Sequence, residues 1–169
     1  MENALKFNKP LTSNKKFIGS IITGQIAGLI MAVVVMIVFT LLGKGPLYPV
    51  QVIGSAVFGE SALQGLNIAA LLAGLVLHQA GPSLLWGSIF GLFAKNTNID
   101  STIKSLTFGL VVGLISMAGP YFLIPAIMNA LHGVDIWNRE VPIFWDWAAH
   151  IVYGASFILY PTVMKKLGK

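Results

Sequence analysis

The sequence predicts an all-α membrane protein with four transmembrane helices. Two observations predict this class: a very apolar composition, and four long apolar runs separated by short polar segments. Hydrophobic residues make up 56% of the 169 residues and charged residues only 10%, whereas a soluble domain carries about 25% charged residues. Such a chain has too few charged residues to cover a surface exposed to water, so we expect it to be embedded in lipid. Its length fits one bundle.

Each apolar run is long enough to cross the membrane, because a helix rises about 1.5 Å per residue and the hydrocarbon core is roughly 30 Å thick. Trp145 and Trp147 lie near the start of the last run, where aromatic residues are typical of the membrane interface. The expected organisation is a cytoplasmic tail at 1–16 and a transmembrane domain at 17–166, with spans at about 17–42, 66–94, 106–131 and 141–164.

The segment at 47–64 is expected to stay on the outer side of the membrane. It is apolar, but Pro49 and Gly54 interrupt it and it is too short to cross. A fifth crossing would also carry the lysines at the C-terminus to the outer side. We therefore expect a short interfacial or re-entrant segment after the first span.

The lysines and arginines predict the orientation. The outer loops hold only Lys44 and Arg139, while all other cations lie in the two tails and the middle loop. The positive-inside rule places this larger set, and both termini, in the cytoplasm. Because the charges cluster at the ends of apolar runs, the net charge of +5 indicates membrane topology and not nucleic-acid binding. The larger set comprises Lys6, Lys9, Lys15, Lys16, Lys95, Lys104, Lys165, Lys166 and Lys169.

The order of motifs indicates an internal repeat. The two outward-running spans share a Gly-x-x-x-Gly-Leu-Ile motif, beginning at Gly24 and at Gly109, and each inward-running span holds one histidine, His78 or His150. We expect two parallel copies of a two-helix unit, related by an axis along the membrane normal. Chance is the alternative, because Gly-x-x-x-Gly is common in membrane helices.

The glycine pairs are expected to pack helices together and not to bind a ligand. Lipid supplies no hydrophobic drive between helices, so small residues that let backbones approach closely must hold a bundle together. The expected packing glycines are Gly24, Gly28, Gly87, Gly91, Gly109 and Gly113.

These motifs resemble a broad group of small four-helix bacterial inner-membrane proteins. The resemblance is carried by Gly-x-x-x-Gly in the outward helices, by His78-Gln-Ala-Gly81 and Trp86-Gly87, and by His150-Ile-Val-Tyr153-Gly154. It implies a four-helix fold and a bacterial inner membrane, and it implies no particular activity.

Ionisable side chains at membrane depth are costly, and His78 is one of the few in this chain. Pro82 lies four residues later and cannot donate to the His78 carbonyl, so a kink and a free carbonyl are expected there. In the fourth run, Asp146 and His150 share a helix face. We expect His78 and His150 to face each other across the bundle, with Asp146 one turn above His150.

Two convergent imidazoles could ligate a haem iron, or could form a metal site together with Asp146. Asp146 could instead fix the His150 tautomer. The plainer alternative is that each histidine bonds only a backbone carbonyl or a hydroxyl such as that of Ser116 or Tyr121.

No enzyme motif is present, and the absence of cysteine excludes disulfides, thiolate nucleophiles and cysteine-ligated metal centres. We therefore do not expect the chain to be catalytic alone.

The favoured function is a structural or accessory subunit of a larger membrane complex, with respiratory complexes among the candidates. The alternative is a ligand-binding protein: a histidine-ligated haem or metal carrier, or a small transporter that oligomerises. The expected partners are lipid and either other membrane proteins or further copies of the chain.

Overall fold

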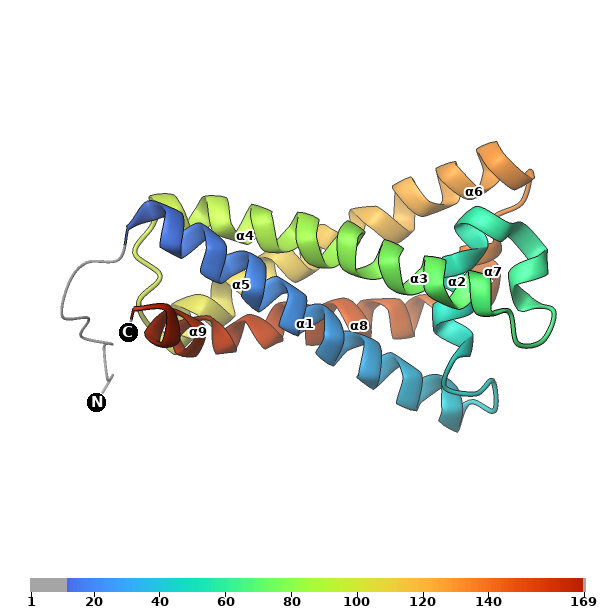
Figure 1. Ribbon diagram of the computed structural model, residues 1–169, viewed down its shortest axis with the longest axis horizontal. Helices are drawn as coiled ribbons and strands as arrows, with labels where there is room; N and C mark the ends of the chain where they lie inside the picture. Colours follow the sequence, from blue (N-terminus) through green and yellow to red (C-terminus); the bar gives the residue numbers. More distant parts are fainter. Residues whose placement is uncertain (1–11, 169) are drawn as a thin grey trace.

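The computed structural model describes residues 12–168 and is all-α within that range. Three helices are long and apolar enough to cross a membrane, and they cover Ser13–Leu41, Ile68–Asn96 and Thr102–His132. The helical class and membrane-spanning length of these three runs are thereby confirmed. Most of the predicted tail at 1–16 lies outside the described residues. The start of the first helix and the end of the last lie at the same end of an elongated bundle (Figure 1).

The first long helix, α1 (Ser13–Leu41), begins where the Thr12 hydroxyl accepts a hydrogen bond from the Lys15 amide at 3.4 Å. Its first half presents small residues to the bundle, including Gly24 and Gly28. Its second half is mostly half-buried, but large exposed apolar side chains repeat every four residues along one face. That face is suited to contact with lipid. It consists of Leu29, Val33, Ile37 and Leu41.

The second long helix is broken near its middle by a proline. It consists of α3 (Ile68–His78), a π-helical turn η2 (Gln79–Ser83) and α4 (Leu84–Asn96). Pro82 lies in that turn and has no amide to donate, so the regular α-helical bonding cannot continue through it. The wider turn lets the helix continue in roughly the same direction. It also rotates the residues of α4 about the helix axis relative to those of α3.

The third long helix is broken in the same manner. It consists of α5 (Thr102–Ser116), a π-helical turn η3 (Gly119–Leu123) that contains Pro120, and α6 (Ile124–His132). It ends at Gly133, whose φ of 70° places it in the left-handed region that favours glycine. Beyond the break α6 diverges from the rest of the bundle (Figure 1).

The fourth apolar run, expected as one helix at 141–164, is divided in the structure. A short α7 (Ile136–Glu140) precedes α8 (Ile143–Ala155), a 3₁₀ turn η4 (Ser156–Leu159) and α9 (Tyr160–Leu167). The turn ends two residues before Pro161, where the missing amide and the proline ring disfavour a continuous α-helix. Because of this division, the run is not among the three long helices.

Close glycine contacts join the helices in two pairs. A Cβ atom added at Gly24 of α1 would lie 2.6 Å from the Gly87 Cα of α4, and one at Gly113 of α5 would lie 2.5 Å from the His150 carbonyl oxygen of α8. Gly154 of α8 meets Gly109 in the same way, with an added Cβ 2.6 Å from its carbonyl oxygen. All six glycines expected to pack helices lie at such contacts.

A short helix fills the end of the bundle opposite α9 (Figure 1). It is α2 (Tyr48–Phe58), followed by the 3₁₀ turn η1 (Gly59–Leu63), and more of its residues are buried than in the neighbouring α3. Gly54 packs against the Ala70 carbonyl of α3, and Gly74 of α3 packs against the Val50 carbonyl of α2. Eleven residues of helix are too few to cross a bilayer. The sequence predicted a short segment at this position.

Candidate functional site

A buried polar cluster lies where the two π-helical turns approach α1 and α8. Ser83 and Ser116 are fully buried, and His150 is 6% exposed. Polar groups at this depth need hydrogen-bond partners inside the protein, since the hydrocarbon core offers none. The cluster has two parts, one around His78 and one around His150.

The first part is a set of amide contacts around the Pro82 break. His78 Nδ1 lies 3.1 Å from Gln79 Oε1, and Gln79 Nε2 donates to Gln25 Oε1 of α1 at 3.0 Å. Gln25 Nε2 donates in return to the Gln79 carbonyl at 3.1 Å. The Ser83 hydroxyl lies 3.2 Å from the His78 carbonyl oxygen and thus replaces the amide donor that Pro82 lacks. The polar notch expected beside His78 is therefore filled by the chain's own side chains.

The second part runs from α7 through α8 to α5. Trp137 Nε1 donates to Asp146 Oδ2 at 3.0 Å, and the other carboxylate oxygen lies 3.8 Å from His150 Nε2. His150 Nδ1 lies 2.5 Å from the Ser116 hydroxyl. This arrangement fits the plainer alternative for His150, a bond to the Ser116 hydroxyl. The order carboxylate, imidazole, hydroxyl can hold or pass a proton, but the Ser116 side chain is completely covered.

The two parts meet between α8 and the first π-helical turn. His78 and His150 lie within the range of electrostatic interaction, and the Tyr153 hydroxyl lies 3.5 Å from the Ser83 carbonyl oxygen. Within residues 12–168, no three His, Asp or Glu side chains are grouped so as to hold a metal ion. A haem or metal site at His78, His150 and Asp146 stays a prediction.

Sequence reasoning missed the amides and the indole of this cluster. Gln25 and Gln79 are the amides deepest inside their apolar runs, which is the signal that could have paired them. Trp137 lies outside the fourth apolar run, in α7, and its indole reaches Asp146 near the start of α8. Nothing in the sequence pattern predicts that contact.

A second polar group, here called the outer network, joins α2, η1 and α7 at the other end of the bundle from α9 (Figure 1). The Arg139 guanidinium holds the Glu60 carboxylate through two contacts of 2.6 and 2.9 Å, and its Nε donates to Glu140 at 2.8 Å. Glu140 also accepts a hydrogen bond from the Tyr48 hydroxyl and lies 3.5 Å from Lys44 Nζ. These contacts fasten α2 and η1 to a segment far along the chain.

The outer network shifts the titration of its members. The hydrogen bond from Arg139 holds the pKa of the Glu60 carboxyl below its usual value. Burial of Glu140 opposes its ionisation, but hydrogen bonds from Tyr48 and Arg139 and the charge of Lys44 outweigh burial, so its pKa is also lowered. Burial, followed by the Glu140 contact, raises the pKa of Tyr48 to about 12.

We expect acid to loosen α2 and η1. Because the pKa values of Glu60 and Glu140 are lower in the folded chain than in the unfolded one, their stabilisation is complete above the unfolded value of about 4.3 and is lost as pH falls through the folded values. Hydrogen-exchange protection of α2 and η1 amides, corrected for intrinsic rates, should fall in that range. Arg139→Gln should lower this protection already at neutral pH and weaken its acid dependence. An unchanged acid profile in Arg139→Gln would contradict the assignment.

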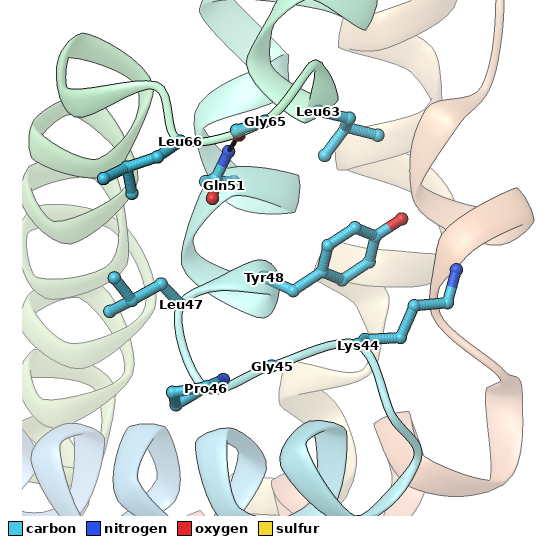
Figure 2. Close-up of a pocket in the computed structure, with 9 residues that line it drawn as sticks. All are labelled: Lys44, Gly45, Pro46, Leu47, Tyr48, Gln51, Leu63, Gly65 and Leu66. Atoms are coloured by element: carbon cyan, nitrogen blue, oxygen red, sulfur yellow. Dashed lines mark hydrogen bonds between the residues drawn. The ribbon is translucent and has the colours of Figure 1, made fainter.

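A pocket of about 310 Å³ opens beside the outer network, between the loop after α1 and the loop after η1. Figure 2 shows Lys44 and Tyr48 at one side of it and Leu47 and Leu66 at the other. Its volume falls in the range of about 300–1,000 Å³ typical of ligand sites.

No protein-family model, curated protein or solved structure matches the chain. The inference of function therefore depends on the geometry described above.

Proposed function

We propose that this chain is a four-span protein of a bacterial inner membrane that serves as a structural or accessory subunit of a larger membrane complex. The observation that carries the proposal is the position of two glycines. Gly81 and Gly119 lie at the breaks of the second and third long helices, and a Cβ atom added at either would meet nothing within 4 Å. The helix-packing glycines described above are covered by the chain itself.

Small residues on an open surface allow another helix to come close, which is the main way that membrane helices associate. Ala80 and Ala118 are exposed beside these glycines. The polar side chains at the same level are bonded to one another inside the bundle. The surface available to a partner is therefore mainly apolar, as suits association with another membrane protein.

Two features support the fourth span and the repeat. The helical segments α8, η4 and α9 follow one another without a loop, and together they are long enough to cross. Each outward helix packs on an inward helix through glycines, α1 on α4 at Gly24 and Gly87, and α5 on α8 at Gly113 and Gly154. Two such pairs are what a parallel two-helix repeat requires.

The orientation can be measured by cysteine labelling, because the chain contains no cysteine of its own. Asn98 and Ser61 are exposed, in the middle loop and near the outer network respectively. We expect Asn98→Cys to react with an impermeant thiol reagent only after the membrane is opened, and Ser61→Cys to react in intact cells. Labelling of position 98 from outside would contradict cytoplasmic termini, since the positive-inside rule would then have failed.

Purification in mild detergent tests the accessory role. The wild-type chain should retain companion subunits identifiable by mass spectrometry, and Gly81→Leu and Gly119→Leu should lose them while their own helices remain folded. Leu29→Ala, on the exposed face of α1, is the matched control and should retain them. A wild-type chain that purifies without companions, or leucine variants that keep them, would contradict the proposal.

His78 and His150 lie close enough to interact electrostatically, which supports a second candidate, a haem or metal carrier. Its test is the absorption spectrum and metal content of the same preparation. A Soret band or stoichiometric metal that disappears in both His78→Ala and His150→Ala would establish this candidate in place of a purely structural cluster.

A further inference from the structure

Gln51 presents its amide oxygen to the pocket beside the outer network. Gln51 of α2 is only 6% exposed, and its amide nitrogen is occupied, donating to the carbonyl oxygens of Ala62 at 2.5 Å and Gly65 at 2.6 Å. Figure 2 shows the amide oxygen turned away from Gly65, toward the space between Leu47 and Tyr48. Among residues 12–168 no hydrogen-bond donor is found for this oxygen. A ligand that enters the pocket therefore meets an acceptor with free capacity.

The same pocket offers a cation at one side. The Lys44 side chain is 50% exposed, and its ammonium lies 4.8 Å from the centre of the Tyr48 ring. Its contact with Glu140, at 3.5 Å, is longer than the 2.8 Å contact of Arg139 with that carboxylate. When Lys44 turns to an incoming anion, Glu140 keeps its hydrogen bonds from Arg139 and Tyr48.

The other side of the pocket is apolar and exposed. Leu47 is 41% exposed and Leu66 is 67% exposed, and both lie on this side of the pocket (Figure 2). Lys44 lies three residues beyond the last residue of α1, Leu41. A cation at the end of an apolar helix lies at the level of lipid headgroups, where lysine side chains are common.

We propose that this pocket binds a phospholipid of the outer leaflet whose headgroup carries an N–H or O–H donor. The phosphate contacts Lys44, the headgroup donor bonds Gln51 Oε1, and an acyl chain lies over Leu47 and Leu66. Phosphatidylethanolamine and phosphatidylglycerol meet these requirements, whereas phosphatidylcholine has no donor for Gln51. The inference rests on the proposed membrane placement, and it does not depend on the proposed partners.

The test uses the purified full chain, stripped of lipid in detergent and titrated with each of the three lipids. Native mass spectrometry counts the bound molecules. We expect ethanolamine and glycerol headgroups to bind at least about fivefold more tightly than choline. Lys44→Gln should weaken binding roughly tenfold, as loss of a charge-assisted contact does. Lys95→Gln is the matched control: an exposed lysine at the opposite end of the bundle, whose loss should change nothing.

A second variant and a soluble headgroup complete the test. Leu66→Asp keeps the Gln51 and Lys44 groups but sets a charge beside the acyl chain, and should weaken the binding of all three lipids. Glycerophosphoethanolamine, which lacks acyl chains, should bind at least tenfold more weakly than the lipid. Equal binding of all three lipids, unchanged binding to Lys44→Gln, or tight binding of the soluble headgroup would each overturn the proposal. Companion subunits and topology are measured in separate experiments. A negative result for lipid binding would therefore not affect the test of the accessory role.

Discussion

Gly113→Leu is expected to separate α5 from α8 and to lower the free energy of unfolding by about 3 kcal/mol, the upper part of the range for overpacked interiors. An added Cβ would already lie 2.5 Å from the His150 carbonyl oxygen and 3.0 Å from the Gly154 Cα. These neighbours are backbone atoms and cannot turn aside, so the helices must move apart. Unfolding of the detergent-solubilised protein in a denaturant titration measures the loss.

Gly81→Leu is the matched control for this substitution. It makes the same chemical change in a long helix at a comparable level, yet nothing lies within 4 Å of the added Cβ. Its unfolding should resemble that of the wild type to within about 1 kcal/mol, the range of ordinary helical propensity differences. If Gly113→Leu were as stable as Gly81→Leu, the close contact between α5 and α8 would be wrong.

Ser116→Ala is expected to give the second-largest loss, about 1–3 kcal/mol, because it leaves a buried imidazole nitrogen without a partner. The Ser116 hydroxyl lies 2.5 Å from His150 Nδ1, and both residues are buried. The same denaturant titration measures the effect. In a double-mutant cycle with His150→Ala, the two losses should not add, since either substitution removes the same contact.

Ser88→Ala provides the comparison for the hydroxyl itself. The Ser88 hydroxyl donates only to the Leu84 carbonyl of its own helix, at 2.8 Å. Its removal should change stability by less than about 0.5 kcal/mol, as for substitutions away from special features. Equal losses from Ser116→Ala and Ser88→Ala, or full additivity in the double-mutant cycle, would show that the contact with His150 contributes little.

The long helices were predictable from the length of the apolar runs in the sequence. The three long helices contain most of the runs expected at 17–42, 66–94 and 106–131. The breaks were only partly predictable. Proline lacks an amide, so a disturbance at Pro82 follows from the sequence. Whether the chain responds with a wider π turn there, or with a tighter 3₁₀ turn before Pro161, depends on the neighbouring helices.

The same breaks limit what could be predicted of the polar cluster. The depth of His78, His150 and Asp146 follows from their positions in the apolar runs. The pairing of Gln79 with Gln25 depends on the rotation of each helix about its axis. A π turn adds about one residue to a turn of 3.6, which rotates everything after it by roughly 100°. Hydrophobic periodicity therefore cannot predict which helix face the polar residues occupy after the break.

The burial of α2 has a consequence for how this chain is made. Its partner α3 follows within a few residues, so the Gly54 and Gly74 contacts can form as soon as α3 enters the membrane. The Arg139 contact with Glu60 spans 79 residues. A ribosome needs roughly 4–16 s to synthesise that length at about 5–20 residues per second. During this interval α2 lacks its contact with α7, and its apolar surface is open to contact with other proteins.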